Sequence, residues 1–209
     1  KNIGIYYMIY SLVFVFVSIG IFFVFIKEGR SFVWMHDGYE QNFPLFSYMS
    51  EYYKDILSEF IATGTLTFPM IDLGLGFGVD IISTLNFYVF GDPLLLFTVF
   101  FPREQIESTY QFFILLRLYL AGVAFSAYCF YHKREDFSIL VGSLVYVFCG
   151  YALFGVIRHP HFATPMIYLP LLLMAVDKLL KEKKSYFFTY IVFLIALTNF
   201  YYLYKLTII

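Results

Sequence analysis

The sequence predicts an all-α polytopic membrane protein. Of its 209 residues, 61% are hydrophobic and 23% are aromatic, whereas only 14% are charged, and the mean hydropathy is +0.75. A soluble domain of this length is closer to half apolar and about a quarter charged, so the excess apolar surface requires a bilayer as its solvent. The net charge of −1 gives no reason to expect nucleic acid as a partner.

Long apolar runs are the second basis for this fold class, and they mark about five expected spanning helices. A span needs roughly 20 mostly apolar residues. The first run is too long for the apolar core of a signal peptide, and no small-residue cleavage site follows it, so we interpret it as a retained span. The runs are 4–26, 107–131, 137–157, 186–209 and a shorter one, 162–176, which reaches spanning length if it extends to Leu180.

Two other features of the apolar runs bear on the organisation of the chain. Cys129 and Cys149 lie inside such runs, and we interpret them as small buried hydrophobes rather than as a disulfide or a metal pair. The chain stops within an apolar run at 207–209. We therefore expect a single membrane domain, 1–209, that is the N-terminal part of a longer protein.

Basic residues in the links predict the orientation. Lys133 and Arg134 follow the second run, and four lysines lie in 178–184. Both links fall on the inner face if the N-terminus is inside, as the positive-inside rule requires, although Lys27 and Arg30 oppose this arrangement. The segment 27–106 then forms a large first outer loop, which holds ten of the fifteen acidic residues.

Helical periodicity predicts an amphipathic helix over 43–60 within this loop. Asn42 is its expected N-cap, and Pro44 lies near the first turn. Its other faces are acidic, so we expect it to lie along the membrane surface with the apolar stripe down, without selecting anionic lipid. The stripe consists of Phe46, Met49, Tyr53, Ile56 and Phe60.

The rest of the outer loop is predicted to be irregular. Glycines at 74, 76 and 78 indicate a tight turn, and no strand or Lys-Ser/Thr pair accompanies them as a nucleotide-binding loop would require. The apolar segment 85–101 is interrupted at 91–93 by Gly-Asp-Pro, so we expect it to be re-entrant or interfacial rather than spanning.

Asp37 is the first candidate for chemistry, because it is the first carboxylate beyond the sequence that enters the outer loop. Glu40 and Gln41 follow it within one helical turn. One interpretation is an Asp-Gly turn in which the side chain bonds to its own backbone. The other is a catalytic base, since a carboxylate at a dry membrane rim can accept a hydroxyl proton.

Cations supply the second set of candidates. Arg158, His159 and His161 form a compact basic cluster at the outer end of the third run, where they could anchor the interface or bind a phosphate. Two histidines separated by one proline make a poor metal site. Arg117 lies in the middle of a predicted span, where a cation is costly and indicates either a functional site or a structural ion pair.

Asn199 and Tyr201 lie in the string TNFYYLY (198–204), near the outer end of the last run. An asparagine in a span can join helices, and a tyrosine at the interface commonly belongs to an aromatic belt. The sequence contains no D-x-D motif, so a divalent cation that holds a sugar diphosphate has no support, and we predict no cofactor.

This order of elements resembles the GT-C superfamily of membrane glycosyltransferases. Several strings are more similar still to the bacterial YfhO-like membrane protein family, and they cover nearly the whole chain in order. They are HDGYEQNFPLF (36–46), GLGFGVDIIS (74–83), NFYVFGDPLLLFTVFFP (86–102), LRLYLAGVAFSAY (116–128), LVYVFCGYALF (144–154), LPLLLMAVDKLL (169–180) and TNFYYLY (198–204). Family members are longer, so this chain matches only their N-terminal part.

The resemblance implies a glycosyltransferase of the bacterial plasma membrane, with its active face outside. The donor would be a polyprenyl-phosphate-linked sugar, and the acceptor a cell-envelope polymer of the teichoic-acid type. By position, Asp37 would be the general base of an inverting transfer, with Glu40 and Gln41 around it. Arg117, Arg158, His159 and His161 would bind the lipid phosphate, whereas the role of Asn199 and Tyr201 stays open. The alternatives are a transporter of lipid-linked sugar and a non-catalytic envelope-assembly subunit.

Overall fold

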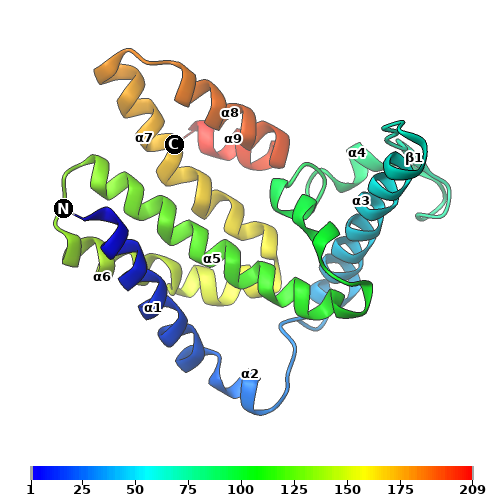
Figure 1. Cartoon of the computed structure of the whole chain (residues 1–209), viewed down its shortest axis with the longest axis horizontal. Coiled ribbons are helices and arrows are strands. Elements are labelled where there is room, and N and C mark those ends of the chain that lie inside the picture. Colours follow the sequence, from blue (N-terminus) through cyan, green and yellow to red (C-terminus); the bar gives the residue numbers. More distant parts are fainter. Residues whose placement is uncertain (1, 209) are drawn as a thin grey trace. The chain divides into compact units, whose positions relative to one another are not determined.

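The computed structural model describes residues 2–208, and helices dominate it (Figure 1). The chain forms two compact units. The first unit consists of Lys1–Trp34 and Ile114–Val192, and the second of Met35–Phe113 and Phe193–Ile209. Almost no sheet is present in the described residues, so the predicted all-α class is confirmed.

Three helical segments are long and apolar enough to cross a membrane. They are Ile3–Ile21, Arg103–Tyr131 and Pro160–Glu182. The first corresponds to α1 (Ile3–Ile21), which the short α2 (Phe23–Lys27) continues. The second combines the 3-10 turn η3 (Arg103–Gln105) with α5 (Ile106–Tyr131), and the third combines η5 (Pro160–Phe162) with α7 (Ala163–Glu182). They confirm three of the expected spans.

The other two expected spans are each divided into shorter helices, so the estimate of five holds only roughly. The run 137–157 becomes α6 (Asp136–Val147) and a π-helical segment, η4 (Tyr151–Val156), with the break at 148–149. The run 186–209 becomes α8 (Tyr186–Thr198) and α9 (Phe200–Ile208). The first break lies in continuous apolar sequence, and the second lies at Thr198 and Asn199, two polar residues too few to end an apolar run, which explains why hydropathy did not indicate either break.

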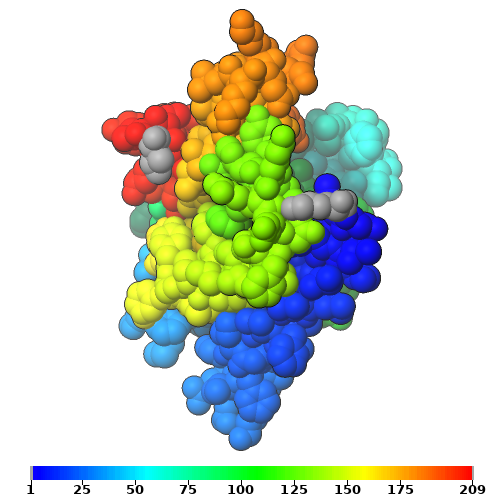
Figure 2. Space-filling view, turned by 90° about the vertical axis from the view of Figure 1, so that its left-hand side faces the viewer, coloured from blue at the N-terminus to red at the C-terminus, as the bar shows by residue number. Residues whose placement is uncertain are grey.

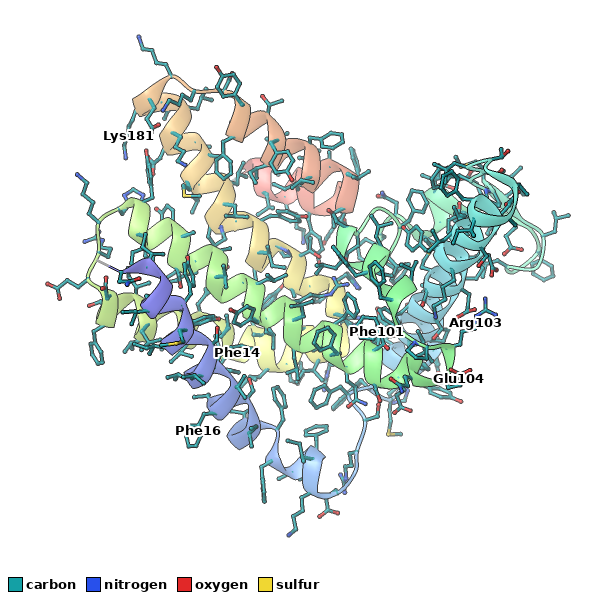
Figure 3. The ribbon with its side chains drawn as sticks, in the orientation of Figure 1. Phe14, Phe16, Phe101, Arg103, Glu104 and Lys181 are labelled. Carbon is teal, nitrogen blue, oxygen red and sulfur yellow. The ribbon has the colours of Figure 1, made fainter. Side chains whose placement is uncertain are left out.

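In the first unit, α1 turns one face toward the other helices and leaves the opposite face bare. Phe14 is 5% exposed and packs against Tyr119 and Phe148, with ring centroids 5.4 Å away in both cases. Phe16, two residues on, is 78% exposed and points away from the unit, as Figure 3 shows. A bare apolar face of this kind is what a membrane-facing helix requires.

Hydroxyl groups join α1, α5 and α6 inside this apolar unit. Tyr6 Oη lies 2.8 Å from Ser126 Oγ, which lies 2.7 Å from Ser143 Oγ. A second pair, Ser11 and Tyr119, is also 2.8 Å apart. Hydroxyl pairs between helices hold membrane bundles together because lipid offers them no alternative partner.

The second unit is built on the long helix α3 (Phe43–Thr63). Helix α3 begins after a π-helical turn, η1 (Gly38–Asn42), and ends at Gly64, which takes a φ of +73°. The expected helix over 43–60 is therefore confirmed. Asn42 is not its cap, however, because η1 continues into α3 without leaving helical conformation, and the Asn42 side chain donates to the Asp37 carbonyl at 3.0 Å instead.

The apolar stripe of α3 is confirmed in part. Phe46, Met49 and Ile56 are buried, and α3 packs along the 3-10 helix η2 (Pro93–Phe100). Phe60 is 45% exposed, and the other residues of the last turn of α3 are exposed as well. The expected placement of the stripe on a membrane surface stays a prediction.

The glycine-rich segment forms a small hairpin, which confirms the expected tight turn, whereas the expectation that no strand accompanies it was wrong. Strands β1 (Ile71–Asp72) and β2 (Val79–Asp80) pair antiparallel, with Ile71 opposite Asp80. Gly76 and Gly78 lie between the two strands and take φ values of +62° and +92°, which residues other than glycine rarely adopt. The short helix α4 (Ile81–Leu85) follows directly, capped by the Asp80 carboxylate.

The apolar segment 85–101 contains no continuous helix, as expected from Gly-Asp-Pro. Gly91 has a φ of +82°, and the Asp92 carboxylate caps η2 by accepting from the Leu94 amide at 2.9 Å. A Cβ at Gly91 would collide with the Leu197 carbonyl, so glycine permits this close approach.

Cys129 and Cys149 are both free and half-buried, and they form no disulfide.

Candidate functional site

Asp37 lies where the loop that follows α2 turns into helix. His36 takes a φ of +64°, and Asp37 is the first residue in right-handed helical conformation, immediately before η1. Asp37 and Gly38 are therefore not the central residues of an Asp-Gly turn, and the Asp37 carboxylate does not cap the helix that follows. The residue is half-buried, whereas the neighbouring Gly38 is buried.

The next turn brings Glu40 and Gln41 close to Asp37 along the same helical segment. The Glu40 amide donates to the His36 carbonyl at 2.7 Å, which closes the turn, and the Glu40 side chain is exposed. The Gln41 amide oxygen accepts from the Tyr88 hydroxyl at 3.1 Å. Tyr88 thus ties η1 to the chain after α4, a pairing that sequence did not indicate.

In the first unit, three of the predicted cationic residues gather. Arg117 on α5 and His161 on η5 are each 4% exposed. His161 lies within electrostatic range of both Arg117 and His159, and the two imidazole centroids are 5.8 Å apart. Arg117 lies midway along a segment long enough to span a membrane, where a charge is costly, and His161 lies at the start of another such segment.

Arg158 lies between two aromatic rings. Its guanidinium carbon is 3.7 Å from the Phe154 ring centroid and 4.3 Å from that of Trp34. Such cation–π contacts stabilise an arginine at an apolar boundary. This arrangement favours the anchoring interpretation of Arg158, although the outer edge of a stacked guanidinium can still donate to a phosphate.

Asn199 and Tyr201 mark the break between α8 and α9 in the second unit. The Asn199 side-chain oxygen accepts from the Tyr202 amide at 3.1 Å, which caps α9, and its amide group donates to the Phe87 carbonyl. The Tyr201 ring packs on Phe87 with centroids 5.4 Å apart, and Lys205 lies over its other side. These contacts are those of a structural junction.

The second unit also holds an acidic cleft that sequence analysis missed. It has a volume of about 360 Å³, and two stacked tyrosines, Tyr48 and Tyr52, form part of its wall. The i, i+4, i+8 spacing of three acids along α3 was the available signal. The cleft is lined by Tyr48, Glu51, Tyr52, Asp55, Ile56, Glu59, Pro69, Ile71, Asp72 and Ile81.

Hydrogen bonds set the charge of this cleft. Arg103, labelled in Figure 3, pairs with Glu51 at 2.7 Å and with Asp55 at 3.0 Å, so one positive charge is shared between two of the carboxylates. The Tyr48 hydroxyl donates to Asp72 Oδ2 at 2.6 Å and holds the pKa of the Asp72 carboxyl below its ordinary value. Burial, followed by this bond, raises the pKa of Tyr48.

Among residues 2–208, no group of three or more His, Cys, Asp or Glu side chains is placed to hold a metal ion. The comparisons with known proteins add one finding. The family model described as "Bacterial membrane protein YfhO" matches residues 11–209. No curated protein and no solved structure matches the chain.

Proposed function

Because the chain belongs to the YfhO family of bacterial membrane proteins, which is related to glycosyltransferases, we propose that it is a membrane glycosyltransferase. The donor is a polyprenyl-phosphate-linked sugar, and the acceptor is a cell-envelope polymer of the teichoic-acid type on the outer face of the plasma membrane. The supporting observation is Asp37, a half-buried carboxylate at the start of η1, in the loop after the first span.

In this proposal Asp37 is the general base. The acceptor hydroxyl gives its proton to the Asp37 carboxylate as its oxygen forms a bond to the anomeric carbon. The bond from that carbon to the phosphate oxygen breaks, and the electron pair leaves on the phosphate, so the anomeric centre inverts. Glu40 and Gln41 orient the acceptor, and Tyr88 supports Gln41 through its hydrogen bond.

The leaving phosphate requires cations near it, because negative charge develops there in the transition state. Arg117 supplies a positive charge within the first unit, and His159 and His161 lie close together beside it as imidazoles that can donate hydrogen bonds, with Arg158 nearby in sequence. A donor carried by a lipid approaches sideways through the bilayer, so a phosphate site inside spanning segments suits it. Asn199 and Tyr201 contribute by holding α9 and the segment around Phe87 in place.

The test compares the full protein with Asp37→Asn in membranes supplied with radiolabelled undecaprenyl-phosphate sugar and envelope polymer. General-base removal is expected to lower the rate of transfer by about 10²–10⁴-fold. Glu104→Gln, an exposed acid of the same loop, is the matched control and should transfer sugar at the parent rate. Full transfer by Asp37→Asn at equal expression would overturn the assignment.

A transporter of lipid-linked sugar is the second candidate, and the broken helices favour it. Interruptions at 148–149 and at Asn199 resemble the discontinuous helices around which transporters build substrate sites. A transporter would move the labelled lipid across a vesicle membrane without forming a new glycosidic bond. Covalent transfer by the purified full-length protein therefore separates the two proposals.

A further inference from the structure

A groove of about 450 Å³ lies between the C-terminal end of α5 and the start of α6, wholly within the first unit. These segments are yellow-green on the face shown in Figure 2. A Cβ at Gly142 would lie 3.2 Å from the Phe125 ring, so glycine allows α6 to pack closely on this ring at the edge of the groove. The lining residues are Phe125, Cys129, Lys133, Arg134, Glu135, Ser138, Ile139 and Gly142.

The two ends of the groove differ in chemistry. Phe125, Ile139 and Gly142 line one end, and the charged residues of the α5–α6 link line the other. The link is fixed by its backbone, since the Lys133 amide donates to the Phe130 carbonyl at 2.9 Å and Lys133 takes a φ of +56°. An amphipathic ligand would therefore meet a preformed surface.

The charge at the polar end of the groove determines which sign of charge the ligand should carry. Lys133 and Arg134 are exposed cations, and Glu135 beside them is an exposed carboxylate. These three side chains of the groove lining together carry one positive charge, whereas the next carboxylate, Asp136, lines a different groove with Asn2 and Tyr6. This charge matches a single phosphodiester anion, whereas a ligand with several negative charges would also have to approach Glu135.

The position of the groove relative to the membrane determines how such a ligand would lie. The second candidate span ends at Tyr131, and Phe125 lies about two turns before this end. Lys133 and Arg134 come directly after it. The apolar end is therefore at the depth of the acyl chains, and the cations are at the depth of the lipid headgroups.

We propose that this groove binds an anionic glycerophospholipid, with its phosphodiester at Lys133 and Arg134 and the start of one acyl chain against Phe125 and Cys129. A free phosphate ester would use the cations and leave the apolar end empty. A zwitterionic lipid would fill the apolar end, but its own positive group would oppose the cations. The site is independent of the glycosyl transfer proposed above.

The test places a fluorescent reporter in the groove and measures its quenching by brominated lipids in vesicles. Ser138 is exposed and lines the groove, so Ser138→Trp supplies the reporter. Trp34→Phe removes the single native tryptophan and keeps a ring beside Arg158. Brominated phosphatidylglycerol and brominated phosphatidylcholine are compared at equal mole fraction in the full protein.

The quenching is expected to show about a fivefold preference of the groove for phosphatidylglycerol over phosphatidylcholine, because one net charge at a membrane surface contributes about 1 kcal/mol to binding. The double variant Lys133→Gln/Arg134→Gln should lose this preference. Lys183→Gln/Lys184→Gln is the matched control and should keep the preference for phosphatidylglycerol. These two lysines are also exposed and also follow a span, and Lys183 has a φ of +55°, close to that of Lys133.

Three results would overturn the proposal. They are equal quenching by the two lipids in the parent, a preference that persists in Lys133→Gln/Arg134→Gln, and a preference that soluble glycerophosphate abolishes. The third result would assign the groove to a free phosphate ester. None of the three depends on sugar transfer, so this site and the proposed glycosyltransferase activity fail separately.

Discussion

The Tyr6 hydroxyl lies 2.8 Å from Ser126 Oγ, and this pair joins α1 to α5 across 120 positions of sequence. Tyr6 is 5% exposed and Ser126 is fully buried, so neither hydroxyl has water as an alternative partner. The bond therefore specifies how these two apolar helices meet, which apolar contacts alone do not do.

Tyr6→Phe should weaken the first unit only modestly. It removes the bond to Ser126, yet Ser126 still donates to the Gly122 carbonyl at 2.8 Å and keeps its contact with Ser143. We expect a loss of about 0.6 kcal/mol, the average for hydrogen bonds between membrane helices. Thermal unfolding in detergent measures it, and an unchanged midpoint would show that the pair contributes nothing.

Gly122→Ala should destabilise the protein more strongly. A Cβ at Gly122 would collide with the Tyr10 hydroxyl, which is fully buried and donates to the Tyr119 carbonyl at 3.2 Å. Overpacking of this kind costs about 1–3 kcal/mol. Gly20→Ala on α1 is the control, because nothing lies within 4 Å of its added Cβ. Equal unfolding midpoints for the two variants would contradict the packing at Gly122.

Asn199→Ala should loosen α9 and the segment before η2 together, because one side chain caps α9 and also donates to the Phe87 carbonyl. Loss of such a cap costs about 0.5–2 kcal/mol. Asn199→Ser restores a capping oxygen without the amide group. In Asn199→Ser, hydrogen exchange should therefore show that the amides of α9 are protected again while those near Phe87 still exchange faster than in the parent. Full protection of both regions in Asn199→Ala would refute the junction.

The hairpin should lose stability in acid. The Tyr48 hydroxyl, followed by the Gly74 amide, lowers the pKa of the Asp72 carboxyl from its ordinary 3.8. A carboxyl whose pKa is lower in the folded state adds stability above its unfolded pKa, and this stability is lost as the pH falls through the folded value. Protection of the Gly74 amide, which donates to Asp72 at 2.7 Å, should therefore fall as the pH drops below the ordinary 3.8 of this carboxyl and through its lower folded-state value.

Tyr48→Phe provides the control for this pH dependence. It removes the first cause of the lowered pKa and leaves the Gly74 bond in place. The acid-induced loss of protection should become smaller and should shift toward the ordinary pKa of an aspartate. A pH profile identical to that of the parent would show that Tyr48 does not stabilise the carboxylate.

Local patterns predicted much of the fold and part of the candidate site. Periodicity predicted α3, and Gly-Asp-Pro predicted the break before η2, because both signals depend on near neighbours in the chain. Arg117 was singled out for its cost in a membrane and His161 as part of a compact basic cluster, yet only the packing of η5 brings them together. The cleft beside Tyr48 needs a hairpin placed against α3, which no local signal specifies.

The sequence by itself determined that this protein is helical and embedded in a membrane, since composition and apolar run length measure directly which solvent the chain prefers. It also identified the polar residues that a bilayer would not tolerate without a role. Only the tertiary structure decided that Asn42 does not cap α3, that two apolar runs are broken, and that Asn199 joins α9 to Phe87. Those outcomes depend on backbone and side-chain partners distant in sequence, and hydropathy carries no information about which partners meet.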